Sequence, residues 1–281
     1  MRADQLGVQA HCLRSEIAAD LDRTLATVAE LGIRALEMMS FRGCRGNWWG
    51  DFGPATDLPP ETIAGRIRAA GLECPSVMVV EQELSAEQFG ATIDWVHGLG
   101  CPRLVLTSFA VASTRSREDW QQAFKRVDEF AQRVSEAGLE FILHTQPDLW
   151  APEGNRSGLD ELDLWRNRQA GRRLEFDPTG AIIHGLDPVD FARRHADDLY
   201  AVHLRDGLTP PEPVFYLAAE PLGAGGVDWP SFLAAVAGSR ADWCILEMEV
   251  TDRTQVMPAL RSSLDYLRDR ELITGRPEAP R

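Results

Sequence analysis

Short apolar runs rich in β-branched residues alternate with helical patterns at almost regular intervals along the chain. The apolar runs predict buried strands, and the segments between them predict helices. Strands are expected near residues 6–10, 34–39, 72–80, 103–107, 139–144, 173–177, 199–204 and 242–248. Helices are expected near residues 16–31, 59–70, 85–99, 118–137, 157–170, 187–195, 228–237 and 254–270.

Several predicted helices end in a glycine just before the next strand, as at Gly32, Gly71, Gly100 and Gly138. Glycine adopts the left-handed conformation of a helix C-terminus without steric cost. The pattern predicts an α/β fold, a single-domain (β/α)8 TIM barrel. A doubly wound open sheet is less favoured, because it usually has fewer strands and a glycine-rich loop after the first. The domain is expected to span residues 1–273, and a flexible C-terminal tail residues 274–281.

Composition narrows the classes of function. The 281 residues carry a net charge of −14, which disfavours nucleic acid and anionic membrane surfaces as partners. The five cysteines are scattered without a C-x-x-C pair, which is typical of reduced thiols. The chain shows no secretory run at its start and no apolar run of about 18 residues. We therefore expect a cytoplasmic protein.

Lysine is almost absent, and Lys125 lies within a predicted helix. A Schiff-base mechanism needs a lysine in the pocket. The sequence therefore argues against a lysine-dependent aldolase.

Potential metal ligands stand at the far ends of four predicted strands: His144, Asp177, His203 and Glu247. They are separated by 33, 26 and 44 residues, which are lengths of β/α units rather than of a zinc finger. Such ligands meet only if the strands are parallel neighbours, as at the mouth of a TIM barrel. Mixed nitrogen and oxygen donors suit Mn²⁺, Fe²⁺, Co²⁺ or Zn²⁺ better than Mg²⁺ or Ca²⁺.

Other charged residues near the strand ends each have two alternative roles. Glu37 ends an apolar run, where a charge needs a partner or a function. Glu247 and Glu249 share one face of a strand, so either both face the barrel interior or Glu249 lies in solvent. Arg205 either binds a carboxylate or phosphate or forms an outward salt bridge.

Two long loops, residues 41–58 and 206–227, follow strands and are expected at the catalytic face. Trp48 and Trp49 lie in the first of them, and Trp150 follows the fifth strand. An indole ring there either packs on the C–H face of a sugar or packs within a lid.

Several strings of the sequence, taken together, resemble the xylose-isomerase-like sugar phosphate isomerase/epimerase superfamily of TIM barrels. They cover nearly the whole chain, and the H-L-R-D and L-G-A-G-G-V-D-W pair is the most specific part. The strings are G-V-Q-A-H-C-L-R, L-G-I-R-A-L-E, F-D-P-T-G-A-I-I-H-G-L-D, V-H-L-R-D, P-L-G-A-G-G-V-D-W and I-L-E-M-E.

The resemblance implies a divalent metal ion at the barrel mouth, held by Glu, Asp, His and Glu of the last four strands. Asp177, His203 and Glu247 match three of these positions, and His144 stands where the family often has Glu. Gly180 stands where D-x-x-H branches have His.

The residues and the resemblance together indicate roles for further positions. Catalytic carboxylates are expected at Glu37, Glu247 and Glu249. Substrate contacts are expected from His11, Trp48, Gln146, Trp150 and Arg205.

The resulting expectation is a metal-dependent isomerase or epimerase that moves a C–H proton beside the carbonyl of a sugar or polyol. The alternatives are an inosose-dehydratase-like lyase and a non-catalytic sugar-binding barrel. A DNA-repair nuclease is disfavoured by the acidic, lysine-poor composition. The expected partner is a small sugar or polyol, with a homo-oligomer possible.

Overall fold

The structure is a computed structural model that describes residues 1–44, 52–150, 158–168, 171–207, 220–248 and 255–274. Trp48, Trp49, Glu249 and all but the first residue of the expected tail lie outside these ranges, so the predictions made for them stay predictions. No helix within the described ranges combines the length and the apolar character that crossing a bilayer requires.

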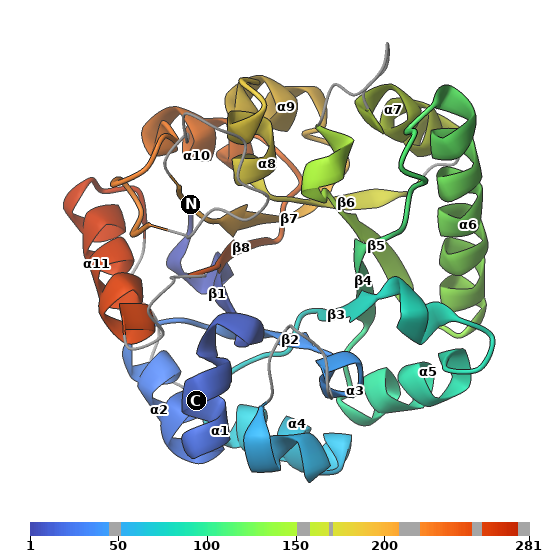
Figure 1. The fold of residues 1–281 in the computed structure, drawn as a ribbon. Helices are drawn as coiled ribbons and strands as arrows, with labels where there is room; N and C mark the ends of the chain where they lie inside the picture. The colour runs from blue at the N-terminus through green and yellow to red at the C-terminus, as the bar shows by residue number, and fades with distance from the viewer. Residues whose placement is uncertain (45–51, 151–157, 169–170, 208–219, 249–254, 275–281) are drawn as a thin grey trace.

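Eight parallel strands close into a barrel, in the order in which they occur in the sequence (Figure 1). Closure is visible at Gly7, which pairs with Ala35 of the second strand and Ile245 of the last. The predicted (β/α)8 TIM barrel is therefore confirmed. The strands are β1 (Leu6–Gln9), β2 (Ala35–Met39), β3 (Val77–Val80), β4 (Arg103–Ser108), β5 (Glu140–His144), β6 (Arg173–Phe176), β7 (Leu199–Leu204) and β8 (Trp243–Leu246).

Helices surround the barrel and cover the outer face of the strands (Figure 1). The α-helices are α1 (Arg14–Ala19), α2 (Leu21–Glu30), α3 (Phe41–Cys44), α4 (Pro60–Ala69), α5 (Phe89–Gly98), α6 (Arg117–Glu136), α7 (Gly158–Arg168), α8 (Pro178–Ile183), α9 (Pro188–Arg194), α10 (Trp229–Ala237) and α11 (Val256–Asp269). The 3₁₀ helices are η1 (Ala3–Gln5), η2 (Ala10–Leu13), η3 (Gly53–Asp57), η4 (Glu81–Leu84) and η5 (Pro147–Leu149).

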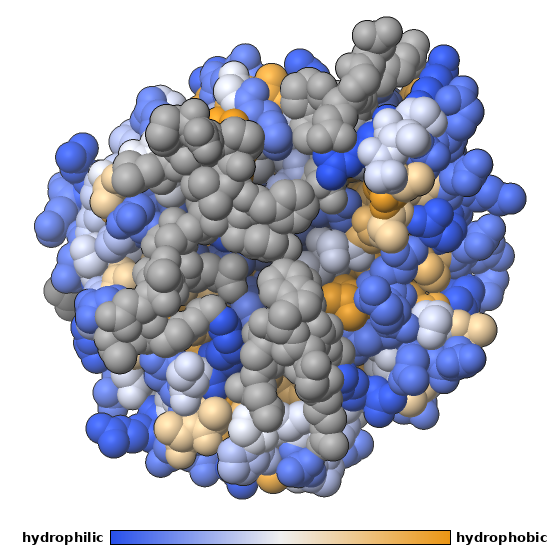
Figure 2. All heavy atoms as spheres, viewed as in Figure 1, coloured by the Kyte–Doolittle hydropathy of each residue, from blue (hydrophilic) through white to orange (hydrophobic). Residues whose placement is uncertain are grey.

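Apolar side chains fill the space between the strands and the outer helices. Phe124 of α6 packs with Trp120 of the same helix and with Trp165 of α7, and Trp229 packs with Phe232 on α10. On the outside, Figure 2 shows mostly hydrophilic residues around the rim of the barrel. The barrel thus has the buried scaffold that can hold polar groups in fixed positions at one end.

Two predicted elements differ from the structure. The helix expected at residues 16–31 breaks at Asp20, whose extended backbone separates α1 from α2 and whose side chain accepts a hydrogen bond from Arg23 N at 3.0 Å. The strand expected at residues 72–80 begins only at Val77. Pro75 precedes it and has no N–H for a ladder hydrogen bond.

The end of β7 is fixed by Asp206, which is completely buried. Its carboxylate accepts hydrogen bonds from backbone N–H groups at both ends of the second long loop and from the indole of Trp229 at 2.8 Å. Gly225 is required here, because a Cβ would lie 2.1 Å from Asp206 Oδ1. The backbone donors are Gly207 at 3.0 Å, Gly223 at 2.8 Å, Gly225 at 3.2 Å and Val227 at 3.2 Å.

Candidate metal centre at the barrel mouth

The predicted ligands occupy the C-terminal ends of four consecutive strands. His144 ends β5, Asp177 follows β6, His203 lies near the end of β7 and Glu247 follows β8. Donor atoms of Asp177, His203 and Glu247 all lie within 4.8 Å of one another. A second set of buried donors, with the same spacing limit, consists of His144, Glu175 and His203. His203 is common to both sets.

The His203 ring lies between carboxylates on two sides. Its Nδ1 is 2.7 Å from Glu247 Oε2, and its Nε2 is 3.2 Å from Glu37 Oε2 and 3.4 Å from Glu175 Oε2. Burial opposes a charged imidazole, but Glu175 and Glu247 outweigh it and raise the pKa of His203 well above its ordinary value. Without a metal ion, His203 is therefore an imidazolium held by acidic neighbours.

His144 has the opposite electrostatic character. Its Nδ1 lies 3.1 Å from the carbonyl oxygen of Thr107, which can only accept a hydrogen bond. Nδ1 therefore carries the proton, and Nε2 presents a lone pair. Burial, and then the charge of His203, lower the pKa of His144 to about 4. A neutral imidazole with an exposed lone pair is the form that binds a metal ion.

Arg205 supplies positive charge at the mouth. Its guanidinium lies 3.4 Å from Asp177 Oδ2 and 3.4 Å from Glu247 Oε1. Burial alone would raise the pKa of Glu247, but Arg205 and His203 outweigh it and hold that pKa well below its ordinary value. Glu247 is thus a carboxylate, and its side chain is 13% exposed, which leaves it accessible from the mouth.

Glu37 lies beside His203 and is completely buried. Ser76 donates a hydrogen bond to Glu37 Oε1 at 2.6 Å, and Glu37 Oε2 faces His203 Nε2. A carboxylate in this place orients a ligand histidine from behind. The structure therefore supplies a positioning role for Glu37, while the catalytic role expected from the resemblance remains a prediction.

Glu175 is the site residue that the sequence analysis missed. It is completely buried, and it pairs in the β-ladder with His144. Burial, and then the charge of Glu37, raise the pKa of Glu175 to about 8. The available signal was a charge between Leu174 and Phe176 in an apolar run, the same signal that singled out Glu37.

Two residues expected to contact substrate have other partners. The amide of Gln146 accepts from Phe109 N at 2.7 Å and donates to Phe109 O at 3.1 Å, so it joins β5 to the end of β4. His11 lies in η2, directly after β1, and Arg14 donates a hydrogen bond to its carbonyl at 2.6 Å. Both are buried near the mouth, and their contact with substrate stays a prediction.

Trp150 takes the space that a side chain at position 180 would need. A Cβ on Gly180 would lie 2.4 Å from Trp150 Nε1 and 2.5 Å from its Cδ1. The indole ring packs against Phe176 and Phe191, with centroids 5.6 and 4.8 Å away. Its buried N–H makes no hydrogen bond to the described part of the chain. Gly180 and Trp150 thus form one packed unit beside Asp177.

The donor atoms fit a divalent metal ion. His144 Nε2 and both carboxylate oxygens of Glu175 are buried and make no hydrogen bond within the described ranges, while His203 Nδ1 and Glu247 Oε2 lie 2.7 Å from each other. Buried polar atoms without hydrogen bonds are costly, and a metal ion would satisfy several of them together. Imidazole and carboxylate donors are those that bind Mn²⁺, Fe²⁺, Co²⁺ or Zn²⁺.

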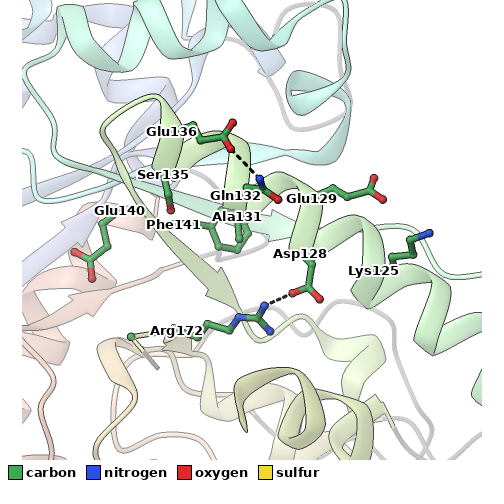
Figure 3. Close-up of a pocket in the computed structure, with 11 residues that line it drawn as sticks. Lys125, Asp128, Glu129, Ala131, Gln132, Ser135, Glu136, Glu140, Phe141 and Arg172 are labelled. Carbon is green, nitrogen blue, oxygen red and sulfur yellow. Dashed lines mark hydrogen bonds and ion pairs between the residues drawn. The ribbon is translucent and has the colours of Figure 1, made fainter. Parts of the chain in front are cut away.

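Lys125 lies far from these groups in the fold, on the outer helix α6. With Asp128, Glu136 and Arg172 it lines a separate pocket on the outer wall of the barrel (Figure 3). The ion pair of Arg172 with Asp128 crosses this pocket. Lys125 is thus not available for a Schiff base inside the barrel.

The fold, together with the polar side chains at the C-terminal ends of its strands, defines a TIM barrel with a candidate metal-binding site at its mouth. The family model of xylose isomerase-like TIM barrels matches residues 25–270. The chain belongs to this family. A sequence comparison with curated proteins finds no match.

Solved structures agree with this fold at low sequence identity. A sugar phosphate isomerase/epimerase from Parabacteroides distasonis ATCC 8503 is 17% identical, with a TM-score of 0.73 over 93% of this chain and 92% of that chain. The probable 3-DHS dehydratase AsbF from Bacillus anthracis is 13% identical, with a TM-score of 0.71 over 96% and 100%. The IOLI protein with a bound zinc atom is 12% identical, with a TM-score of 0.71 over 94% and 97%. At these identities the likeness concerns the fold alone.

Proposed function

We propose that the chain is a metal-dependent isomerase or epimerase that transfers a C–H proton beside the carbonyl of a sugar or polyol. The observation that carries this proposal is the convergence of Asp177, His203 and Glu247 at the mouth, beside a buried His144 Nε2 that makes no hydrogen bond within the described ranges. Similarity to a sugar phosphate isomerase/epimerase and to a zinc-bound relative supports it.

The metal ion would be held by Asp177, His203 and Glu247, with His144 beside them. When bound, it would lower the energy of the negative charge that develops on a substrate carbonyl during proton removal. Glu37, itself held by a hydrogen bond from Ser76, contacts His203 Nε2 and fixes the orientation of its ring. Asp177 is fixed by hydrogen bonds from the backbone N–H of Thr179 at 2.8 Å and from its hydroxyl at 2.5 Å.

Glu247 is the carboxylate best placed to move the proton among the described residues, since it is ionised and partly open to the mouth. Glu249 is the second candidate base and lies outside the described ranges. Arg205 would bind an anionic or strongly polar group of the substrate, because a guanidinium presents parallel N–H donors to a carboxylate or phosphate.

A dehydratase or other lyase is the second candidate. One base that forms an enolate, together with one acid that protonates a β-leaving group, is sufficient for that reaction. An epimerase needs bases on two faces, and Glu247 is the only acidic side chain among the described predicted ligands with appreciable exposure. The similarity to a dehydratase fits this alternative.

The test is hydrogen exchange in D₂O with the metal-loaded protein and a panel of ketoses, inososes and keto acids. We expect deuterium at the carbon beside the carbonyl of at least one compound. Glu247→Gln should reduce this exchange by roughly 100-fold or more, as expected for loss of a positioned base. Asp242→Asn, a change at the opposite end of β8, is the control and should exchange at the wild-type rate.

Each other outcome rejects the isomerase in favour of a named alternative. Exchange accompanied by loss of water identifies the lyase. Binding of a sugar without exchange identifies a non-catalytic barrel, and nicking of abasic DNA identifies the nuclease. The small-molecule partner, the absence of nucleic acid and membrane partners, a homo-oligomer and a cytoplasmic location remain predictions from the sequence.

A further inference from the structure

The barrel interior holds a second group of unsatisfied donors below the mouth. Glu175 lies on β6, two residues before Asp177, which follows the strand. This spacing places Glu175 about 6–7 Å nearer the N-terminal end of the barrel. Its neighbour in the ladder is His144, and the rings of His144 and His203 have centroids 5.0 Å apart. Three strands therefore bring one carboxylate and two imidazoles to one buried point.

Charge compensation distinguishes this lower group from the mouth. Asp177 and Glu247 already have the guanidinium of Arg205 beside them. The nearest cation to Glu175 among the described residues is the imidazolium of His203, whose Nε2 lies 3.4 Å from Glu175 Oε2 and which also faces Glu37 and Glu247. Neither oxygen of Glu175 accepts a hydrogen bond from the described part of the chain. One imidazolium shared among three acidic side chains does not balance their charge, and a metal ion would supply the missing positive charge.

We propose that the resting metal ion lies in this lower position, bound by His144 Nε2, Glu175 and His203 Nε2. Two imidazoles and one glutamate form a ligand set typical of zinc sites that keep an open position. The proposal rests on the proposed metal dependence but replaces the mouth as the resting position of the ion. Nothing in the sequence resemblance includes Glu175 among the ligands.

A metal ion at the mouth and a metal ion at the lower position require opposite tautomers of His203. Binding at the mouth requires a lone pair on Nδ1, with the Nε2 proton donated to Glu37. Binding at the lower position requires a lone pair on Nε2, with the Nδ1 proton facing Glu247 Oε2 at 2.7 Å. A neutral His203 therefore serves one position at a time, and we expect one ion per chain. With the ion below, Glu247 and Arg205 remain at the mouth for the substrate.

Crystals of the Co²⁺- or Zn²⁺-loaded protein, measured at the absorption edge of the metal, test the position directly. We expect one anomalous peak at bonding distance, roughly 2.0–2.2 Å for zinc, from His144 Nε2 and a Glu175 oxygen. A peak bound by Asp177 and Glu247, with no peak at Glu175, overturns the inference and leaves the proposed function intact. Failure to bind any ion overturns both.

Titration of the metal-free protein with Zn²⁺ gives an independent measure. Glu175→Gln removes a ligand charge and should weaken binding by more than about 100-fold, whereas Glu37→Gln, which removes an equal charge beside His203, should weaken it by only roughly 10- to 100-fold. Equal losses in the two variants, or wild-type affinity in Glu175→Gln, contradict the assignment. Circular dichroism of each metal-free variant verifies that it is folded.

Discussion

Individual side chains in this barrel are set by partners on neighbouring strands. The Nδ1 of His144 is fixed by a carbonyl of β4, and the ring of His203 is fixed by Glu37 of β2 and Glu247 after β8. Because each partner comes from a different strand, a substitution at one position changes the protonation or orientation of the next. Single effects can be measured separately at buried groups outside this cluster.

His195 is a buried histidine outside the metal centre. Burial, followed by the charges of Arg166 and Arg194, lowers its pKa to about 4, although Asp163 lies 3.5 Å away. An unfolded chain has an ordinary histidine pKa of about 6.5. Between these values only the unfolded chain takes up the proton. The free energy of unfolding should therefore have its full value above pH 6.5. It should fall by about 3 kcal/mol as the pH decreases toward 4.

Urea denaturation of the wild type and of His195→Gln at several pH values measures this effect. The difference in unfolding free energy between the two proteins should change with pH only below about 6.5. A difference that is independent of pH from 7 to 4 would show that His195 has the same pKa in the folded and the unfolded chain, which contradicts the prediction.

Gly180 and Trp150 should be energetically coupled. A methyl group at position 180 would meet the indole at 2.4 and 2.5 Å, so Gly180→Ala should destabilise the protein by about 1–3 kcal/mol through overpacking. In a Trp150→Phe background the smaller ring leaves room, and the same substitution should cost less. A double-mutant cycle from urea denaturation measures the coupling, and purely additive effects would exclude the contact.

At the scale of elements, the ends of strands and helices depend on specific side-chain caps. Asp206 joins the end of β7 to the start of α10 through the backbone N–H groups of Gly223, Gly225 and Val227 and the indole of Trp229, and it also accepts from the N–H of Gly207. This explains why the H-L-R-D and L-G-A-G-G-V-D-W strings occur together. The carboxylate of the first string is the acceptor for donors of the second, and the loop between them can vary.

Asp206→Asn should therefore be strongly destabilising. The amide has one acceptor oxygen in place of two and brings an N–H₂ group toward several buried donors. We expect a loss of about 3 kcal/mol or more, as for breaking a buried, charge-assisted network. Asp228→Asn, at the exposed cap of α10, should change stability by less than about 1 kcal/mol. A thermal scan of both variants compares them, and similar losses would contradict the role of Asp206.

The sequence predicted the number and order of strands well, because apolar β-branched runs and glycine C-caps are local signals. It could not predict that Asp20 divides a helix, since an N-cap residue also occurs on exposed helix faces. It also missed Glu175. In a strand buried on both faces, the sequence pattern does not reveal which side chains face the barrel interior, and the partner of Glu175 is a histidine on another strand.

For the whole molecule, closure of the barrel brings together groups that are far apart in the chain. The alignment of predicted strand ends was sufficient to predict that Asp177, His203 and Glu247 would converge. The positions of Trp48, Trp49 and Glu249 depend on long loops, whose conformation is set by contacts that local patterns do not encode. Substrate choice is therefore the part of the function that the sequence predicts least.

Because the candidate ligands meet only in the closed barrel, metal binding should stabilise the whole folded chain. Four acidic side chains (Glu37, Glu175, Asp177 and Glu247) lie around His203 inside the barrel, and Arg205 pairs with two of them, Asp177 and Glu247. A divalent ion that binds only the folded chain should stabilise it by about 2.7 kcal/mol at a concentration of 100 times its Kd. For a chain of this size, that corresponds to a rise in Tm of roughly 5–10 °C.

Differential scanning fluorimetry with Zn²⁺, Mn²⁺ or Co²⁺ after removal of metal by a chelator measures this shift. The double variant Glu175→Gln/Glu247→Gln lacks one ligand of each position and should show almost none of it. Asp242→Asn keeps both ligand sets and should show the full shift. If the wild type and the double variant respond alike, the ions bind elsewhere on this acidic protein, and the barrel is not the metal site.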